Sequence, residues 1–484
     1  MVKREYFRIR KLVRKYDRKT GKFVIDIRYK AKTEITPRTI GVAEAFGLGV
    51  DNHKEHVIYD DVTIKISPRD IVYLTGDSGS GKSVLLRALE KDLKGEAVNV
   101  ESIQPDPDQP IVETVGRDLD EALGLLSRVG LNDAYLFLRR YGQLSDGQKY
   151  RYRIAKLIES GKQWWILDEF AATLDRDTAK IVAFNLQKQA RRTGKAVVAA
   201  TTHTDLFEDL APSVHIHKGW GKKVQVKYYP NSLNRVCSVT HGLRIEEATM
   251  KDYRQLAEFH YRNPETHAPP LKIFTMKRES GTAVGLILYS WPPIAARGRR
   301  QALGKILSIN ELNEKLATIS RVILHPKFRS IGLGVRLVKE TLPLVGRPYV
   351  ETIAVMARYN PFFEKAGLKK IIESQGHESV RHAVGNLEKL GFKRYTLAST
   401  ETNLQLLKTF SKEELEEIKA ILLTVSTGYY KRLKSTSKPY VKREEFKEFL
   451  EEASLETIAK IISRLAVLAQ TKVYLFWQNP NLEV

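Results

Sequence analysis

The stretch GDSGSGKS, residues 76–83, has the composition and spacing of a loop that binds nucleotide phosphates. It follows the apolar run DIVYLT and precedes the helix-like run SVLLRALEKDL, which is the strand, glycine loop and helix order that such a site needs. Backbone N–H groups of the loop can surround the phosphates, a lysine can reach the terminal phosphate and a serine can bind Mg2+. We therefore predict an ATP site formed by Gly76, Asp77, Ser78, Gly79, Ser80, Gly81, Lys82 and Ser83.

Two acids at the end of a later apolar run, WWILDE, supply the second part of this predicted site. Asp168 follows the run directly and suits a role in holding Mg2+. Glu169 is then placed to orient or deprotonate the water that attacks the terminal phosphate. The two runs together predict hydrolysis of ATP and not binding alone.

The run YGQLSDGQKYRYRIAKLI lies between these two parts, and with them it resembles the ABC ATPase family. The signature of that family reads Leu-Ser-Gly-Gly-Gln, and this chain has Asp146 in place of the first glycine. The resemblance implies that Ser145 and Gly147 contact the γ-phosphate of an ATP molecule bound to a partner, and that Gln148 belongs to the same ATP site. It therefore implies a homodimer with ATP between the two ABC domains. Asp146 adds negative charge near that phosphate.

Further positions carry the same resemblance, which covers residues 60–230. Asp175 in ATLD matches the D-loop of the family, and His203 in TTHTD matches its switch histidine. A histidine without a role at a strand end is the alternative for His203. The Q-loop glutamine is Gln104 or Gln109, and the spacing to ETV favours Gln104, which would then be a Mg2+ ligand with Ser83 and Asp168.

A second glycine-containing stretch, VILHPKFRSIGLGVRLV at residues 322–338, follows another strand-like run. Arg329, Gly332 and Gly334 have an Arg-x-x-Gly-x-Gly spacing that resembles motif A of the GNAT acetyltransferases. In that family the loop and the following helix bind the pyrophosphate of acetyl-CoA. The run LRIEEATMKDYRQLAEF resembles the opening strand and helix of the family, GTAVGLILY its third strand, and YVETIAVMARYNPFFEKAGLKK its fifth strand and motif B.

This second resemblance implies a site for acetyl-CoA. The amides of residues 322–324 would hydrogen-bond the pantetheine and polarise the thioester carbonyl. The residues that it implies for acetyl-CoA binding are Val322, Ile323, Leu324, Arg329, Ser330, Ile331, Gly332, Leu333, Gly334, Val335, Asn360 and Phe363.

The acid and the base of acetyl transfer stay open. Many family members use a tyrosine in a Tyr-Glu-Lys-x-Gly pattern as the acid, but this chain has FFEKAG, so that Phe363 stands there and cannot donate a proton. Tyr359 could substitute, or it is a packed aromatic side chain. Glu351 could be the base, or it is a salt-bridged or solvated carboxylate, and His325 has the same two interpretations.

The pattern of strands and helices predicts three regions. Up to Tyr229, buried strand-like runs alternate with amphipathic helices, which is typical of a parallel α/β sheet, and a basic hairpin precedes them. We predict an α/β chain with an ABC-type P-loop ATPase domain in residues 1–235, a GNAT α+β domain in residues 236–400 and a helical region in residues 401–484.

The composition favours a polyanionic partner. The 484 residues include 80 Lys and Arg against 57 Asp and Glu, a net charge of +23, and such an excess is typical of nucleic-acid binding. A solvated basic surface in a thermophile is the alternative. The RNA-binding candidates, from two basic runs, are Arg297, Arg299, Arg300, Lys431, Arg432 and Lys434. The single cysteine and the lack of a long apolar run lead us to expect a cytoplasmic protein without a membrane partner.

The whole chain is similar to an archaeal-type family described as an ABC ATPase fused to a predicted acetyltransferase. We therefore predict an ATP-hydrolysing, acetyl-CoA-dependent N-acetyltransferase acting on RNA, with tRNA as the favoured substrate. The tRNA cytidine acetyltransferases, which join a different ATPase to the GNAT fold, are the analogy. One alternative is an acetyltransferase for protein lysines or small amines that the ABC domain regulates. The other is an ATP-driven nucleic-acid-binding protein in which the GNAT domain is an inactive scaffold.

Overall fold

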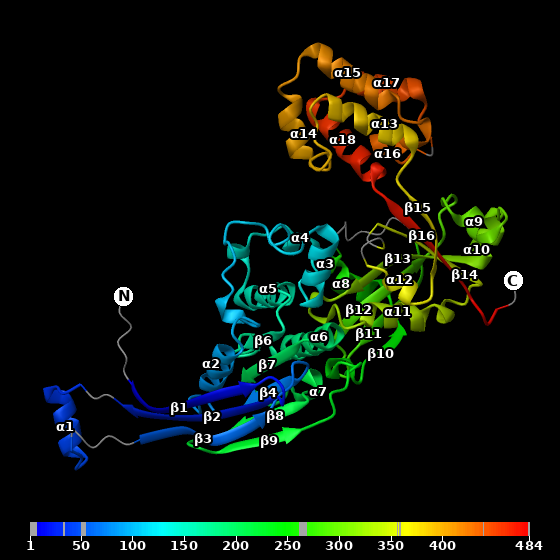
Figure 1. The fold of residues 1–484 in the computed structure, drawn as a ribbon. Helices are drawn as coiled ribbons and strands as arrows, with labels where there is room; N and C mark the ends of the chain where they lie inside the picture. Colours follow the sequence, from blue (N-terminus) through cyan, green and yellow to red (C-terminus); the bar gives the residue numbers. More distant parts are fainter. Residues whose placement is uncertain are drawn as a thin grey trace. The chain divides into compact units, whose positions relative to one another are not determined.

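The computed structural model describes residues 7–31, 34–49, 55–260, 269–355, 357, 360–438 and 440–482. The chain forms two compact units. The first contains Met1–Thr266, Ile273–Ile287 and Val322–Leu337, and the second contains His267–Lys272, Leu288–Arg321 and Val338–Val484. Figure 1 shows the strands and helices of each unit along the chain.

An antiparallel sheet of three strands begins the described chain, and it contains the predicted basic hairpin. Its strands are β1 Phe7–Asp17, β2 Lys22–Ala31 and β3 Glu55–Lys65, in that order across the sheet. Gly21 closes the turn between β1 and β2 with a φ of +68°, and a β-carbon there would lie 2.9 Å from the carbonyl oxygen of Ile66. Helix α1, Pro37–Ala45, follows β2 and buries none of its residues.

A six-stranded sheet carries the first phosphate loop. Its order is β5-β6-β7-β4-β8-β9, and neighbouring strands pair in parallel except β8 with β9, which are antiparallel. All residues of β4, β6 and β7 are buried, as expected where helices cover both faces of a parallel sheet. The prediction of a parallel α/β domain is confirmed. The strands are β4 Ile71–Thr75, β5 Ala97–Asn99, β6 Trp164–Leu167, β7 Ala196–Thr201, β8 Val214–Lys218 and β9 Val224–Tyr228.

The helices that accompany this sheet begin and end with ordinary caps. Gly194, at φ +67°, ends the longest of them, α6, at the residue where a left-handed conformation is favoured. These helices are α2 Lys82–Asp92, α3 Leu119–Arg128, α4 Ala134–Phe137, α5 Asp146–Glu159, α6 Arg176–Thr193 and α7 Phe207–Leu210.

A seven-stranded sheet follows, with the order β10-β11-β12-β13-β14-β16-β15. Strands β13 and β14 pair in parallel, whereas β16 is antiparallel to both β14 and β15. The strands are β10 Arg244–Glu247, β11 Pro270–Lys277, β12 Ala283–Ser290, β13 Leu316–Leu324, β14 Tyr349–Ala354, β15 Lys369–Ser374 and β16 Lys472–Gln478. The helices between them are α8 Met250–Leu256, α9 Arg299–Leu303, α10 Ile309–Lys315, α11 Leu333–Thr341 and α12 Phe362–Lys365.

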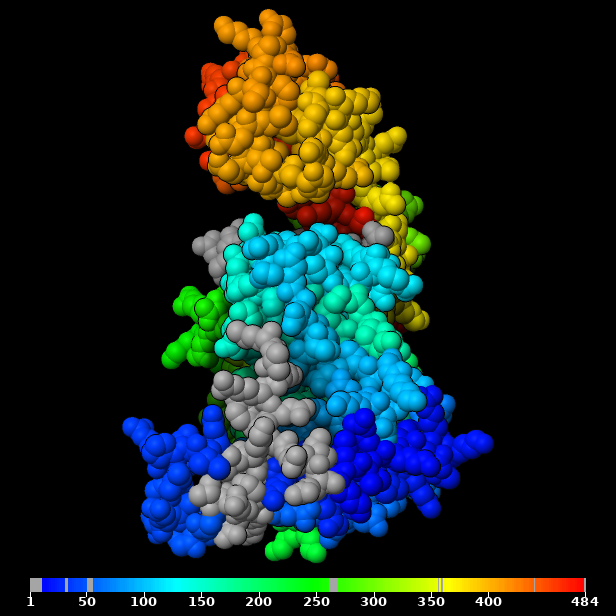
Figure 2. Space-filling model, turned by 60° about the vertical axis from the view of Figure 1, so that its left-hand side comes forward, coloured from blue at the N-terminus to red at the C-terminus, as the bar shows by residue number. Residues whose placement is uncertain are grey.

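Six helices lie between β15 and β16 in the chain and share one hydrophobic core. In the space-filling view they form one lobe, coloured from yellow to orange-red (Figure 2). They are α13 Glu378–Lys389, α14 Thr400–Leu407, α15 Lys412–Leu423, α16 Tyr430–Lys434, α17 Arg443–Glu451 and α18 Leu455–Ala469. None of the helices in the described ranges combines the length and the apolar character that a membrane crossing requires.

The end of the chain differs from the helical region that we expected in residues 401–484. The helical lobe begins at residue 378 and ends at residue 469, and residues 472–478 form a strand. Four successive residues of this strand, from Val473 to Phe476, are buried, because β16 lies between β14 and β15. The helices are therefore an insertion between two strands of one sheet.

Candidate functional site

The first phosphate loop connects β4 to α2. Its lysine forms hydrogen bonds to backbone carbonyl groups of the same loop. The Lys82 ammonium donates to the carbonyl oxygens of Gly76 and Asp77, both at 2.7 Å. Burial lowers the pKa of Lys82, while the nearby charges of Asp168 and Glu169 oppose that shift. The Ser80 hydroxyl is buried and has no hydrogen-bond partner in the described part of the chain. A phosphate could therefore take up donors here without breaking a side-chain ion pair.

Two glycines of this loop are required by their surroundings. Gly76 has φ +144°, and a β-carbon would lie 2.1 Å from the Lys218 carbonyl oxygen. Gly81, the N-cap of α2, has φ +108°, and a β-carbon would lie 2.5 Å from Ile58. Among the other predicted ATP-binding residues, Asp77, Ser78 and Gly79 are exposed and Ser83 is partly buried in the first turn of α2. The loop geometry and the unpaired hydroxyl fit ATP.

The two acids after β6 lie beside this loop. Glu169 is exposed and has φ +48°, a left-handed conformation that non-glycine residues rarely adopt outside special sites. Its N–H donates to the Asp168 carboxylate at 3.0 Å, and the next N–H, from Phe170, donates to the Ala200 carbonyl oxygen of β7 at 2.7 Å. These bonds hold the turn, so that the carboxylate of Glu169 faces solvent where a water molecule could attack.

The predicted signature residues form the start of α5. Ser145 is the N-cap, and its hydroxyl accepts from the N–H of Gln148 at 3.4 Å. The Gln148 side chain accepts from the N–H of Ser145 at 3.1 Å, which completes a capping box. Gly147 lies close to the segment after β6, because a β-carbon there would be 3.0 Å from Leu174. The exposed Ser145 thus lies at the N-terminus of a 14-residue helix, which is the positive end of the helix dipole.

The other predicted ATP-site residues lie at or near the ends of strands and helices. Asp175 is the N-cap of α6 and accepts from the Thr178 N–H at 3.3 Å. The backbone of His203, just after β7, accepts from the Tyr73 hydroxyl at 2.5 Å. Gln104 and Gln109 are both exposed, and the Gln109 carbonyl oxygen accepts from the Tyr141 N–H, shortly before the signature, at 3.1 Å. The structure therefore ties Gln109, and not Gln104, to the signature segment.

Arg329, predicted to bind the pyrophosphate of acetyl-CoA, is occupied. Its guanidinium donates to the carbonyl oxygens of Leu324, Asn132 and Phe259, each at 3.0 Å. Its side chain is only 17% exposed. Three of its five N–H donors thus go to backbone acceptors. This arginine fixes the start of the loop, and its predicted role at a pyrophosphate is corrected to a structural one.

The neighbouring lysine joins the same loop to the ATPase domain. The Lys327 ammonium lies 2.5 Å from a carboxylate oxygen of Asp175 and 3.2 Å from one of Asp177. Arg278 also contacts Asp177, at 3.0 Å. Burial alone would raise the pKa of Asp175, but hydrogen bonds from Lys327 and Thr178 outweigh it and lower the pKa. We call this contact of Lys327 with the two aspartates the D-loop joint.

The glycine part of the second loop is open. Gly332 has φ +90°, is exposed, and has no atom within 4 Å of an added β-carbon. Ser330 has φ +68°, and its hydroxyl accepts from the Asn185 amide of α6 at 3.3 Å. Of the other residues implied for acetyl-CoA, Ile323, Ile331 and Leu333 are buried, Val322, Leu324, Gly334 and Val335 are partly buried, and Asn360 is exposed. Phe363 is buried, with its ring centroid 4.1 Å from that of Phe362.

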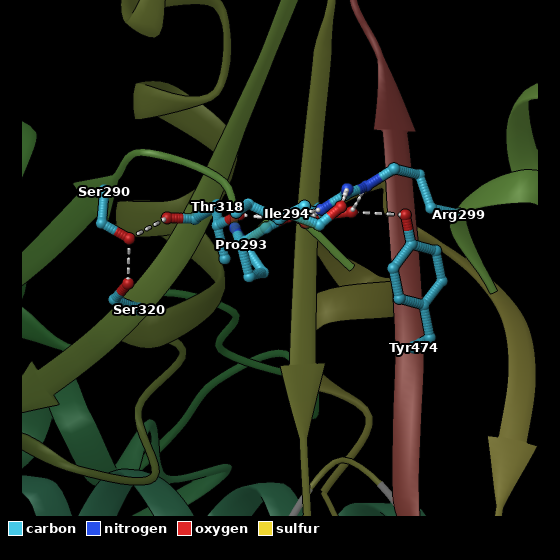
Figure 3. A network of polar contacts seen from close by, with 8 residues as sticks. Ser290, Pro293, Ile294, Arg299, Thr318, Ser320 and Tyr474 are labelled. Carbon is cyan, nitrogen blue, oxygen red and sulfur yellow. Dashed lines mark hydrogen bonds and ion pairs between the residues drawn. The ribbon is translucent and has the colours of Figure 1, made fainter. Parts of the chain in front are cut away.

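Glu351 has no exposed surface and cannot serve as the base. Its carboxylate accepts from the Arg299 guanidinium at 2.6 and 3.0 Å, from the Tyr474 hydroxyl at 2.6 Å and from the Thr318 hydroxyl at 3.1 Å. Figure 3 shows the side chains of Arg299 and Tyr474 directed to the same carboxylate. These four hydrogen bonds satisfy the buried charge, so Glu351 is a structural carboxylate and the prediction of a catalytic role is corrected.

The two remaining acid and base candidates are His325 and Tyr359. His325 accepts from the Lys327 N–H at 3.3 Å and packs against Phe259 with ring centroids 4.7 Å apart. Burial lowers the pKa of His325, which favours the neutral ring. Tyr359 lies outside the described residues.

The six RNA-binding candidates divide by their surroundings. Arg299 is 7% exposed, and besides Glu351 it donates to the carbonyl oxygens of Pro293 and Ile294, so the prediction that it binds RNA is corrected. Lys434 lies 2.9 Å from Glu445. Arg297, Arg300 and Arg432 are exposed, and Lys431 is partly exposed.

Sequence reasoning missed Trp220, which lies in the turn between β8 and β9. The indole is 64% exposed, and a β-carbon on Gly79 would lie 3.6 Å from it. A large aromatic face beside a phosphate loop is suited to stacking on a base. The signal in the sequence is a tryptophan between two glycines, Gly219 and Gly221, where a turn would ordinarily be polar.

The comparison with protein families matches residues 59–172 to the family described as ABC transporter. The cytochrome c biogenesis ATP-binding export protein CcmA of Ruegeria pomeroyi is 30% identical over 171 residues, which cover 31% of this chain and 80% of that protein. The protein of the same name from Paracoccus denitrificans is 32% identical over 167 residues, covering 30% of this chain and 76% of that protein. A dimeric ATP-binding cassette solved in a post-hydrolysis state with ADP and phosphate is 19% identical, with a TM-score of 0.30 over 36% of this chain and 91% of that chain.

The family match includes the strand, loop and helix around Lys82 and the turn at Asp168 and Glu169. These are the residues whose geometry forms a phosphate site with an acid beside it. The first part of the chain is therefore an ABC-type ATPase domain that binds and hydrolyses ATP. Through this domain the chain belongs to the family of ABC transporter ATP-binding proteins.

Proposed function

We propose that this chain is an ATP-hydrolysing, acetyl-CoA-dependent N-acetyltransferase that acts on RNA. The observation that carries the acetyltransferase half is the end of the parallel ladder between β13 and β14. Their register runs only from Leu316 and Tyr349 to Thr318 and Glu351, although β13 continues to Leu324. Beyond Thr318 this register ends, so the backbone amides of β13 that face β14 are available to a ligand, whereas β12 pairs with the other edge of β13.

The elements after β13 support the same assignment. A loop with Gly332 at φ +90° leads into α11, and the loop backbone is open at that glycine. A helix that begins at such a loop offers N–H groups and a partial positive charge to phosphates. Residues 322–324 and 331–335 would hold acetyl-CoA mainly by their backbone, because the Arg329 side chain is held by three backbone carbonyl groups. Acetyl-CoA would supply the activated acetyl thioester.

In the ATPase half, Mg2+ and ATP would be held by the loop at residues 76–83 and by Asp168. Glu169 would orient the attacking water, and Trp220 would lie against the base. We further propose that two copies of the chain enclose ATP, with Ser145 and Gly147 of each copy facing the nucleotide of the other. The exposed helix start at Ser145 supports this arrangement, because a helix N-terminus offers N–H groups and a partial positive charge to a phosphate.

The D-loop joint gives ATP turnover a route to the acetyl-CoA loop. Asp175 belongs to the segment that follows the hydrolytic acids, and Lys327 belongs to the loop that precedes Gly332. A movement of Asp175 on ATP hydrolysis would therefore displace the loop that carries Lys327. We propose that ATP binding and acetyl-CoA binding are coupled through this contact.

A second candidate function is favoured by the contacts of the side chains that were predicted to bind acetyl-CoA or to transfer a proton. Arg329 is bound to backbone carbonyl groups, Glu351 is buried and paired with Arg299, and Phe363 cannot donate a proton. An ATP-driven RNA-binding protein whose second domain is only a scaffold would have the same features.

The test is transfer of a labelled acetyl group. The protein is incubated with acetyl-labelled CoA, Mg-ATP and total tRNA, and the nucleosides are separated by liquid chromatography and mass spectrometry. One labelled nucleoside that requires the protein is the expected result. Label that enters added protein or polyamine instead of RNA would move the substrate to those amines, and failure to bind acetyl-CoA at all would favour the scaffold.

A further inference from the structure

A basic pocket lies in the second unit where β15 and β16 meet the inserted helices. Its volume is about 560 Å³, within the range of pockets that hold a small organic ligand. Arg297 lies on the loop before α9, His377 lies directly before α13, and Tyr429 and Arg432 lie at and within α16. Two basic runs that are more than a hundred positions apart in the sequence thus meet at one site.

The charge of the pocket favours an anion. Arg297, Arg432 and Lys472 line it, and none of its lining residues is an aspartate or a glutamate. Arg297 donates to the Ser374 hydroxyl at 2.9 Å with one guanidinium nitrogen. Arg432 is exposed. Positive side chains without a carboxylate among the lining residues suit a phosphate group.

Aromatic side chains form the other part of the lining. The Tyr429 and His377 rings lie with centroids 5.4 Å apart at an angle of 51°, and Tyr429 is partly exposed. The His377 ring is oriented by its Nδ1, which accepts from the Ser379 N–H at 3.2 Å. An exposed aromatic face beside cations is the combination that binds unpaired nucleotides, because a base can stack while its phosphate is neutralised.

The floor of the pocket is fixed. Tyr474 is 2% exposed and its hydroxyl donates to Glu351 at 2.6 Å. Gly298, at φ +105°, lets the loop of Arg297 lie directly on this ring, since a β-carbon would be 2.8 Å from Tyr474. Burial and the Glu351 carboxylate raise the pKa of Tyr474 far above its ordinary value, so the phenol remains a donor. These contacts therefore fix the position of the loop of Arg297 relative to the Tyr474 ring.

The same network reaches the end of the parallel ladder. Glu351 accepts from Tyr474 and from Thr318, and the register of β13 with β14 ends at the pair of Thr318 and Glu351. Figure 3 shows Thr318 and Tyr474 on opposite sides of this network. The Glu351 carboxylate thus connects the pocket floor, by hydrogen bonds, to the point where the pairing of β13 with β14 ends.

From these observations we infer that the pocket binds one unpaired nucleotide of an RNA substrate. The base stacks on Tyr429, and Arg297 and Arg432 contact the flanking phosphate. The inference rests on the proposed function, because it identifies this nucleotide as the acetyl acceptor. It is limited to unpaired RNA, since a base within a duplex has no free face to offer Tyr429.

The experiment compares pairs of variants that change the same charge at lining and non-lining positions. Arg297→Gln and Arg432→Gln alter the pocket, whereas Arg300→Gln and Lys431→Gln each remove one positive charge at a residue that does not line it. Tyr429→Leu removes the stacking face. Binding of a fluorescent single-stranded RNA octamer is measured against salt for the full-length protein, with ATP hydrolysis measured in the same preparations as a control for folding.

We expect Tyr429→Leu to weaken RNA binding by roughly five-fold or more, the lower end of the loss for one stacked base. Arg297→Gln and Arg432→Gln should each weaken it more than their neighbours do and reduce the salt slope by about 0.7, the value for one contact with single-stranded phosphate. ATP hydrolysis should be preserved in all five variants.

Three results would overturn the inference. In one, the lining variants behave like Arg300→Gln and Lys431→Gln. In another, inorganic phosphate competes as well as adenosine monophosphate, so that the site recognises phosphate alone. In the third, an acidic peptide binds more tightly than the octamer. If the lining variants bind normally while wild-type protein acetylates RNA, only the pocket assignment fails. If wild-type protein transfers no acetyl group although the lining variants lose RNA, only the acetyltransferase proposal fails.

Discussion

The two glycine-containing loops of this chain differ in what their cations contact. In the loop at residues 76–83, Lys82 lies on two carbonyl groups of its own loop. In the loop at residues 326–332, Lys327 is paired with Asp175 and Asp177, and Arg329 is bound to three carbonyl oxygens. The first loop keeps its cation for an incoming phosphate. The cations of the second loop contact aspartates of the ATPase domain and backbone carbonyl groups. We therefore expect a ligand to contact mainly the backbone of this loop.

Replacing the lysine of the first loop should have the largest effect. Lys82→Ala removes the donor that reaches the terminal phosphate, and we expect ATP hydrolysis to fall by about 100-fold or more. Steady-state release of phosphate measures it. Lys91→Ala, at an exposed position of the same helix, is the matched control and should hydrolyse ATP normally. Retained hydrolysis in the Lys82→Ala protein would remove this lysine from the site.

A charge placed in the second loop should act on acetyl-CoA alone. Gly334→Glu adds bulk and negative charge in the first turn of α11, and we expect affinity for acetyl-CoA to fall by at least roughly ten-fold because like charges meet at a helix N-terminus. Calorimetry of acetyl-CoA measures it, and ATP hydrolysis should stay normal. Lys339→Glu, on an exposed part of α11, controls for the added charge. Normal binding by the Gly334→Glu protein would exclude this loop as the pyrophosphate site.

Breaking the D-loop joint should have an intermediate effect on coupling. Lys327→Ala should leave ATP binding intact but reduce the influence of ATP on acetyl-CoA affinity by several-fold, since couplings of this kind are typically about 1–3 kcal/mol. The dissociation constant for acetyl-CoA is measured with and without a non-hydrolysable ATP analogue. Lys339→Ala is the control. Equal coupling in the two variants would show that the contact transmits nothing.

The same joint should make a small, acid-sensitive contribution to stability. The pKa values of Asp175 and Asp177 are both lowered in the folded chain, so their stabilising effect is fully present above their ordinary pKa near 4 and is lost as the pH falls through the lowered values. Lys327→Met should therefore reduce the free energy of unfolding by roughly 0.2–1 kcal/mol at pH 7 and by less at pH 3. Thermal unfolding at the two pH values measures this difference. An equal loss at both pH values would mean that packing, and not charge, is responsible.

The ATP site could be predicted from the sequence because its parts are local. The strand, the loop and the helix around Lys82 are contiguous, and Asp168 and Glu169 follow directly from the strand WWIL. Trp220 was missed because its position beside Gly79 depends on the return of β8 and β9 to the sheet. Nothing within a short window of the sequence indicates that contact.

For the seven-stranded sheet, the sequence indicated individual strands up to β14. It did not indicate the order of the strands across the sheet. The run KVYLFWQ at residues 472–478 pairs with β14 and β15 only after six helices have intervened. The ion pair of Arg299 with Glu351 was not predicted, because the two residues are far apart in the sequence. Arg299 was interpreted as part of a basic surface and Glu351 as an acid of the fifth strand. Long-range pairing decides the role of such residues, and local pattern does not reveal it.

The most direct test of the account is a titration of acetyl-CoA into wild-type protein already saturated with a non-hydrolysable ATP analogue. If the two loops hold different phosphates, calorimetry should show one acetyl-CoA bound per chain, with no displacement of the ATP analogue. Displacement of the analogue by acetyl-CoA, or no binding of acetyl-CoA with or without the analogue, would contradict the separate roles of the loops at residues 76–83 and 326–334.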